Sequence, residues 1–437
     1  FVCLFFNTLL NSIFLFAVLA KKAKFAAMQF SEIIGQKPLT EHLVQMVKQN
    51  RLSHALLFLG REGSGALNIA LAFTQYIVCE RQNGKTTVAP APSLFAEEST
   101  TAASEEKNEN LHDSCGVCPA CIKASKFIHP DIHFCYPVVT RKSGEQPVST
   151  DYIVEWRKFI TNKPYGNAYD WLQFIGAENK QGNITAKECN EIIHKMSLKS
   201  FEAEYKILIL WMPEYLGSEG NKLLKLIEEP PPNTLFIFVA ENESLILSTL
   251  LSRLQLVKFP PLNDADIAQA LEKQYEDLAT VRALQIASIS EGNYREALLH
   301  LQNSGEDDWE IMLRNWLNTI IKTGTAAQVK WIEEAAKLGR EKQKQFLKYF
   351  LRLLQEAVRL EIMGTNQPGT SEAMSSTIEL ALKFNNICAI EQKEAIMKEL
   401  DFASYYIERN ANAKILFHAL TIKLLHIIHN KSVILVN

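Results

Sequence analysis

Short, largely apolar runs alternate with amphipathic segments along the first 261 residues of the chain. Such runs are typical of strands that are buried on both faces of a parallel sheet. They lie at residues 53–59, 131–136, 205–211 and 235–240. Apolar residues recur with helical spacing between them, at residues 43–47, 66–79, 186–196 and 221–229. The alternation predicts an α/β fold in which helices cover both faces of a parallel sheet.

Beyond Pro260-Pro261 the strand signal disappears, and the rest of the chain has helical periodicity. Residues 265–274 and 278–289 predict two helices, and residues 291–295 mark a break before a third. Large apolar residues then share helix faces, Trp309, Leu313, Trp316 and Leu317 on one and Phe346, Tyr349, Phe350 and Leu353 on another. We therefore expect three domains, at residues 28–261, 262–304 and 305–437.

Two segments depart from these patterns. Residues 81–113 contain prolines, serines, threonines and acidic side chains without an apolar period, which predicts a flexible surface insertion. Residues 1–20 are nearly continuously apolar and precede three lysines, a pattern that a membrane span would also have. Because the charges follow the apolar run and Met28 makes a natural start, we interpret residues 1–27 as upstream sequence outside the native protein. Even a real span would leave the remainder cytoplasmic by the positive-inside rule.

The amino-acid composition says little about the partners and the cellular compartment of the protein. The 437 residues carry a formal net charge of -3, so any contact with nucleic acid must come from a local patch or from partner proteins. Eight cysteines are few for a disulfide-stabilised chain of this length, and three of them lie within residues 115–121. We expect an intracellular, cytoplasmic protein.

Residues 60–67 have the frame of a phosphate-binding loop without its chemistry. In a working loop, G-x-x-x-x-G-K-[ST], backbone N–H groups wrap the phosphates, the lysine reaches their oxygens and the hydroxyl ligates Mg²⁺. Gly60, Gly63 and Gly65 keep the frame, but Ala66 and Leu67 stand where the lysine and the hydroxyl belong. The alternative is an ordinary glycine-rich turn between a strand and a helix. In either case we expect no ATP hydrolysis by this loop.

The strand predicted at residues 205–211 also lacks the acidic residues that hold Mg²⁺ in a nucleotide hydrolase. It ends in Trp211-Met212-Pro213-Glu214. Glu214 is displaced and follows a proline, so we interpret it as a surface charge or as a residue that stabilises a helix N-terminus. Two independent parts of an ATPase site are therefore missing.

The strongest chemical signal is a group of cysteines, Cys115, Cys118 and Cys121, with Cys79 at the end of the preceding helix as the expected fourth ligand. Zn²⁺ prefers four soft donors in a tetrahedron, and C-x-x-C turns present two thiolates at that angle. We expect a structural zinc ion. A catalytic zinc is disfavoured because only His112 lies beside the group, and an iron–sulfur cluster or free thiols are the remaining alternatives.

The segment Asn221-Lys-Leu-Leu-Lys-Leu-Ile-Glu-Glu-Pro-Pro231, followed by Ser252-Arg253, resembles a motif pair of the bacterial clamp-loader subunits of DNA polymerase III. His54-Ala55 and the cysteine group after the phosphate-loop helix are similar to the same family. The degenerate loop resembles the delta prime branch rather than the ATP-hydrolysing gamma/tau branch. The resemblance covers residues 28 to about 300, and the rest only by position and type. Departures are Leu254 in place of the usual cysteine, the acidic insertion and the residues upstream of Met28.

This resemblance implies an AAA+ module, a helical lid at residues 262–304 and a helical collar at 305–437 that oligomerises. It implies a non-hydrolysing stator of the clamp loader, acting in DNA replication with the gamma/tau and delta subunits, the sliding clamp and primed DNA, and with no membrane partner. Two alternatives stay open. One is a catalytic AAA+ ATPase with a diverged phosphate loop, and the other is a zinc-dependent DNA-binding adaptor that joins no ring.

The resemblance also implies roles for individual residues. With Ser252 beside it, Arg253 is expected to act as an arginine finger on the nucleotide of a neighbouring subunit. The alternative is an exposed salt bridge at a strand end. Arg295 matches the sensor arginine of the lid, and facing an empty site it is expected to make a domain-packing contact. Lys222 and Lys225 could contact DNA phosphates or simply belong to a solvated helix face.

Overall fold

The computed structural model describes residues 29–84, 113–141, 144–177, 180–275, 277–302, 306–321, 324–363, 376–408 and 411–429. The chain divides into two compact units, Phe1–Gln302 and Asn303–Asn437, and each is described by itself. The predicted upstream segment 1–27 and all but the ends of the predicted insertion 81–113 lie outside the described residues.

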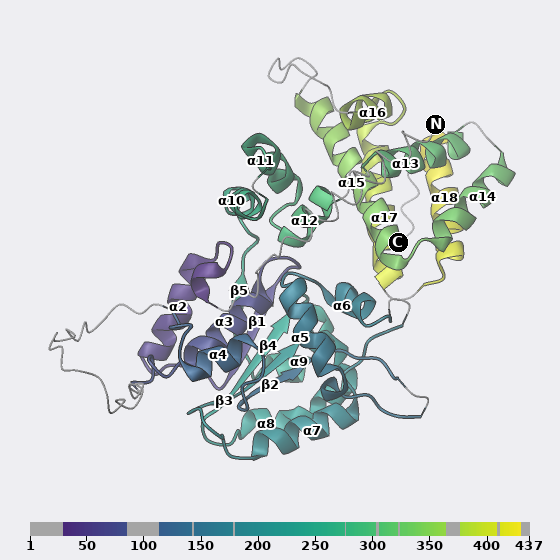
Figure 1. The fold of residues 1–437 in the computed structure, drawn as a ribbon. Coiled ribbons are helices and arrows are strands. Elements are labelled where there is room, and N and C mark those ends of the chain that lie inside the picture. Colours follow the sequence, from purple (N-terminus) through teal and green to yellow (C-terminus); the bar gives the residue numbers. More distant parts are fainter. Residues whose placement is uncertain are drawn as a thin grey trace, which may run out of the picture. The chain divides into compact units, whose positions relative to one another are not determined.

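A five-stranded sheet with the order β2-β3-β4-β1-β5 forms the centre of the first unit (Figure 1). All its strand pairs are parallel, so the prediction of a parallel α/β fold is confirmed. The strands are β1 (Ala55–Gly60), β2 (Ile132–Cys135), β3 (Lys206–Trp211), β4 (Thr234–Ala240) and β5 (Gln255–Phe259). The sequence patterns did not include β5, an edge strand in which only Val257 and Phe259 are buried.

Successive residues of the central strands point into two different cores. On one face, Phe58 and Ile209 pack with α3 (Ala66–Val78), of which every residue is buried. On the other face, Leu57 and Leu208 pack with α7 (Ala186–Ser197). This double burial explains why the strands are apolar at consecutive positions.

Short helices complete this α/β layer. They are η1 (Phe30–Glu32), α2 (Lys37–Lys48), α4 (Pro119–Ser125), η2 (Ser149–Tyr152), α5 (Ile153–Asn162), α6 (Ala168–Phe174), η3 (Pro213–Tyr215), η4 (Gly217–Leu223), α8 (Leu224–Glu228), η5 (Glu243–Leu245) and α9 (Ser248–Leu251). The helix predicted over residues 221–229 is wrong in its start: a 3₁₀ segment, η4, precedes α8. There Gly220 approaches Leu250 so closely that an added Cβ would lie 2.8 Å from its Cδ1. A larger residue at this position would require the Leu250 side chain to shift.

The end of the first unit is a bundle of three helices, α10 (Asp264–Gln274), α11 (Thr280–Ile289) and α12 (Tyr294–Gln302). They enclose a small core that includes Ile267, Leu271 and Ile286. The predicted break falls at Glu291 and Gly292, which both have positive φ, and α12 then begins within the predicted break, at Tyr294. The backbone N–H of Leu262 donates to the carbonyl of Gly292 and ties this bundle to the end of the sheet.

The second unit is all-helical in the part that the structure describes. Its helices are α13 (Glu306–Ile321), α14 (Thr325–Lys337), α15 (Arg340–Met363), α16 (Ser376–Asn385), α17 (Ile390–Glu408) and α18 (Ala413–His429). The two predicted apolar faces meet in one core, where the rings of Trp316 and Trp331 stack at 4.5 Å. Among the described residues of both units, no helix combines the length and the apolar character that crossing a membrane requires.

Candidate functional site

The phosphate-loop frame survives intact between β1 and α3. Gly63 and Gly65 have φ of 72° and 85°, in the left-handed region that favours glycine. The first N–H groups of α3 begin directly after Gly65, so the loop still leads into a helix N-terminus, the usual place for a phosphate. This backbone fits a phosphate-loop frame, and an ordinary glycine-rich turn that leads from a strand into a helix would share both features.

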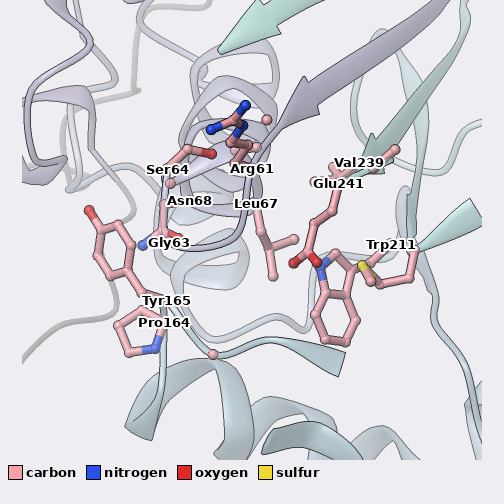
Figure 2. A pocket seen from close by; sticks show the side chains of 16 residues that line it. Arg61, Gly63, Ser64, Leu67, Asn68, Pro164, Tyr165, Trp211, Val239 and Glu241 are labelled. Carbon is pink, nitrogen blue, oxygen red and sulfur yellow. The ribbon is translucent and has the colours of Figure 1, made fainter. Parts of the chain in front are cut away.

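Two large apolar side chains lie beside this frame, where a nucleotide hydrolase has polar ones. The loop borders a cavity of about 30 Å³. Figure 2 shows Leu67 extending toward the cavity from the start of α3, with Trp211 at the end of β3 across from it. An isobutyl group and an indole therefore stand where a hydroxyl and Mg²⁺-binding carboxylates would be needed. Neither Leu67 nor Trp211 can ligate Mg²⁺, and the oxygen-bearing side chains that line the cavity are Ser64, Asn68, Tyr165 and Glu241.

Glu214 links the ends of two neighbouring strands. Its Oε1 accepts hydrogen bonds from the backbone N–H groups of Glu241 (2.7 Å) and Asn242 (2.9 Å). Its Oε2 is buried and has no partner among the described residues. Burial raises the pKa of this carboxyl, although the two backbone hydrogen bonds oppose the rise. Glu214 lies in the first turn of η3, as the helix N-terminal interpretation expected, but the interpretation as a surface charge is wrong because its carboxylate joins the ends of β3 and β4.

Arg295 ties the three-helix bundle to the phosphate loop. Its Nε and Nη2 donate to both carboxylate oxygens of Asp170 at 2.5 and 3.0 Å, and its Nη1 lies 2.8 Å from Glu62 Oε1. The Arg295 and Asp170 side chains are only 6% and 10% exposed. This is the domain-packing contact that the sequence predicted. It is a buried ion pair with the bidentate geometry that makes such pairs strong.

The same bundle approaches the loop backbone closely. A Cβ added to Gly63 would lie 1.9 Å from the side-chain oxygen of Asn293, so no other residue fits there without movement. The backbone N–H of Tyr294 donates to the carbonyl of Gly63 at 3.3 Å. The start of α12 therefore contacts the loop itself, and two acidic side chains, Glu62 and Asp170, occupy its surroundings.

The four predicted cysteines come together in one cluster. The sulfur atoms of Cys79, Cys115, Cys118 and Cys121 all lie within 4.8 Å of one another. The Sγ atoms of Cys115 and Cys121 are 3.9 Å apart. Tetrahedral zinc with Zn–S bonds of about 2.3 Å requires sulfurs about 3.8 Å apart, so the residues fit this ion. The cluster combines the C-terminal end of α3 with the start of α4.

Hydrogen bonds prepare the cluster for a cation. The backbone N–H groups of Cys115, Cys118 and Cys121 donate to the sulfurs of Cys79, Cys115 and Cys118 at 3.3–3.4 Å. A hydrogen bond from Cys121 lowers the pKa of the Cys79 thiol to about 4, which favours a thiolate. Four buried or half-buried cysteine sulfurs at this separation are typical of structural metal sites.

The edge of the predicted insertion is part of this module. Asp113 accepts hydrogen bonds from the backbone N–H groups of Phe30 and Ser31, both at 3.0 Å. The Gln82 side chain donates to the Asp113 carbonyl, and Gln29 donates to the Ser114 carbonyl. The start of the described chain is thus attached to the segment that leads into the cysteines, and the predicted flexible insertion does not extend to residue 113.

Arg253 lies at the surface, directly before β5. Its guanidinium forms an ion pair with Glu228, and the two side chains are 33% and 45% exposed. The salt bridge considered as an alternative is therefore present in the isolated chain. Ser252 lies beside it, and its hydroxyl accepts from Arg253 Nη1 at 3.2 Å. Whether Arg253 serves a neighbouring subunit stays a prediction.

The two lysines near this arginine are exposed. Lys222 forms an ion pair with Glu219 at 2.8 Å, three residues earlier, and Lys225 is exposed on α8. These positions fit a solvated helix face. They carry no indication of a phosphate site.

Sequence reasoning missed the acidic partners of both arginines. Glu62 is a variable position of the phosphate-loop pattern, and Asp170 lies in a segment that had no clear prediction. Glu228 belongs to the resemblance motif, but nothing in the motif signals its ion pair. Asn167-Ala-Tyr-Asp170 is a helix-capping signature that could have predicted α6, since the Asn167 side chain accepts from the Asp170 backbone N–H.

The fold and the loop define the class of protein, an AAA+-type module that has the frame of a nucleotide site and lacks its hydrolytic residues. Residues 35–93 and 93–263 match the model of a family described as "DNA polymerase III, delta subunit". Since this match spans more than half of the chain, the chain belongs to this family of DNA polymerase III delta prime and clamp-loader subunits.

Individual relatives are more distant. The chain is 23% identical to DNA polymerase III subunit tau of Bacillus subtilis over 327 residues, which cover 73% of this chain and 44% of the relative. It is 23% identical to subunit delta' of the same bacterium over 256 residues, which cover 59% and 56%. The chain thus spans about half the length of these relatives. A solved gamma subunit-related protein of Thermotoga maritima aligns with 88% of this chain and 98% of its own, with 13% identity and a TM-score of 0.31.

Proposed function

We propose that this chain is a non-hydrolysing stator subunit of a bacterial clamp loader. In this role it would assemble with gamma/tau and delta subunits in the cytoplasm and help to place a sliding clamp on primed DNA during replication. Family membership supports the assignment to a clamp loader. The observation that carries the stator role is the pairing of an intact phosphate-loop frame with Leu67 and Trp211 in its cavity.

The fixed lid supports the same role. In a nucleotide-driven AAA+ subunit the lid must move as nucleotide binds and leaves, because such cycles depend on closure around the ligand. Here the bidentate Arg295–Asp170 pair and the Asn293 contact with Gly63 join the lid directly to the loop. A subunit of this kind keeps one geometry while its neighbours change theirs.

We expect the isolated chain, residues 28–437, to release phosphate from ATP only at background rates. The reason is that Ala66 and Leu67 replace the lysine and the Mg²⁺-binding hydroxyl of the loop pattern, and β3 ends in Trp211 where a hydrolase has carboxylates. A phosphate-release assay with and without the chain tests this. Ala66→Asp is the matched variant, because it adds a negative charge at the loop and suits the first turn of α3. Turnover that scales with the chain and disappears in this variant would contradict the proposal.

The chain is further proposed to supply Arg253 as an arginine finger to a neighbouring ATP site. An arginine finger contributes about 10³ to 10⁵ in rate at the site that it serves. Arg253→Ala should therefore remove that site's share of the ATPase activity of the reconstituted clamp loader and leave assembly intact. Arg282→Ala, an exposed arginine on α11, is the control. Unchanged activity of the Arg253→Ala complex would refute the finger.

Gel filtration with the gamma/tau subunit separates the ring subunit from a DNA-binding adaptor. A stator should co-elute with gamma/tau and delta, and clamp loading should fall when it is omitted. A chain that elutes alone and binds primed DNA by itself would instead be an adaptor.

A further inference from the structure

The guanidinium of Arg253 is held at several points in the isolated chain. Its Nε donates to Glu228 Oε1 at 2.6 Å, and its Nη2 is ion-paired with the same oxygen. On the other side, Nη1 donates to the carbonyl of Thr249 at 2.6 Å and to the Ser252 hydroxyl at 3.2 Å. The anchors therefore come from two elements, the end of α8 and helix α9 with its C-cap residue Ser252.

Both elements are fixed to the core. Ile227, the neighbour of Glu228, is 1% exposed, and its carbonyl lies 2.9 Å from Nε2 of His54 at the start of β1. Leu250 of α9 is fully buried in the same core. Glu228 thus projects from a rigid position, whereas a free arginine side chain would sample many rotamers.

We propose that Glu228 is a positioning residue for Arg253 and presets the guanidinium for the neighbouring nucleotide. This inference rests on the proposed finger. The Glu228 carboxylate holds the edge of the guanidinium that carries Nε and Nη2, and the Thr249 carbonyl holds Nη1. An exposed ion pair of this kind is weak, so it cannot withhold the arginine from a polyphosphate. It can restrict the rotamers of Arg253 before the neighbour arrives, which is the benefit of preorganisation.

The test uses the reconstituted clamp loader. Glu228→Ala should lower kcat for ATP at the site next to this chain by about fivefold, the rate equivalent of about 1 kcal/mol. KM should stay unchanged, because the nucleotide is bound by the neighbour. Glu228→Gln, which keeps an oxygen for Nε, should recover part of the loss. Glu229→Ala, which changes the adjacent exposed carboxylate, is the matched control and should behave like the wild type.

A double variant separates this inference from the finger itself. If Glu228 acts through Arg253, Glu228→Ala combined with Arg253→Ala should be no slower than Arg253→Ala alone. Full activity of Arg253→Ala would overturn the finger and the positioning role together. The positioning role alone would be overturned if kcat fell in the Arg253→Ala complex but was normal or higher in the Glu228→Ala and Glu228→Gln complexes. Gel filtration of each complex verifies assembly, and an assembly defect in Glu228→Gln but not in Glu229→Ala would assign Glu228 to the interface and also overturn it.

Discussion

Replacement of Cys121 by serine is expected to abolish zinc binding and to destabilise the first unit by about 3 kcal/mol or more. Structural zinc sites bind their ion with apparent free energies of about 10–16 kcal/mol, and this energy is available to folding because the site does not exist in the unfolded chain. Cys121 is fully buried and shares the cluster with three other sulfurs. Elemental analysis of the purified chain should give one zinc ion in the wild type and none in the variant, and thermal unfolding should give the stability loss.

Cys189→Ala is the control for this experiment. Cys189 is also fully buried, but it lies in α7 and outside the cluster. It should retain zinc and lose only the packing energy of one small side chain. Zinc retained by Cys121→Ser would contradict the assignment of this residue as a ligand. If the wild type contained iron and absorbed visible light, the site would be assigned to an iron–sulfur cluster instead of zinc.

Replacement of Arg295 by methionine is expected to cost about 3–5 kcal/mol, because it leaves the buried Asp170 carboxylate without its partner. The methionine keeps much of the volume of the arginine side chain, so the loss reflects charge more than packing. Urea unfolding of the chain measures it. Combining Arg295→Met with Asp170→Asn should recover a large part of the loss, since no unpaired charge then remains. A single variant as stable as the wild type would show that the pair does not fix the lid.

The contribution of Asp170 should depend on pH. Burial alone would raise the pKa of this carboxyl, but hydrogen bonds and charge from Arg295 outweigh burial and hold the pKa below its usual value. Because the pKa of Asp170 is lower in the folded state, its ionised carboxylate stabilises the fold at pH values above the unfolded-state pKa of about 3.9. This stability is lost as the pH falls through the folded-state pKa. The penalty of Asp170→Asn should therefore be full near about pH 6 and shrink below about pH 4. A penalty that does not change with pH would contradict this linkage.

The central strands were predictable because burial on both faces leaves an unmistakable pattern. β3 and β4 are buried at every position, so their residues are nearly all apolar. β5 has the pattern of an edge strand, with three of its five residues exposed, and too few apolar positions to stand out. The helices α5 and α6 were not predicted, although α5 buries Trp156, Phe159 and Ile160 at helical spacing and α6 begins with a capping box. Trp156 and Trp171 meet edge to face at 5.2 Å, and no periodicity within either helix signals that contact.

Some residues of the candidate site could also be predicted from the sequence, and others could not. The cysteine ligands could be predicted because their chemistry is local in three cases, and the helix that ends at Cys79 brings the fourth to them. The acidic partners of the arginines could not, since Asp170 is 125 residues from Arg295 and Glu62 is 233 residues from it. Such pairs depend on how α6, the loop and α12 come together, and a single sequence contains no signal for that arrangement.

Helix α3 connects two features that otherwise seem unrelated. It begins at the phosphate loop and ends beside Cys79, and all 13 of its residues are buried. The cysteine cluster at one end of α3 and the core along its length therefore both hold the helix in one position. In this chain Ala66 and Leu67 stand in place of the lysine and the hydroxyl, and both are buried as part of this helix. The buried helix thus anchors the end of the loop by packing alone, independently of any bound nucleotide.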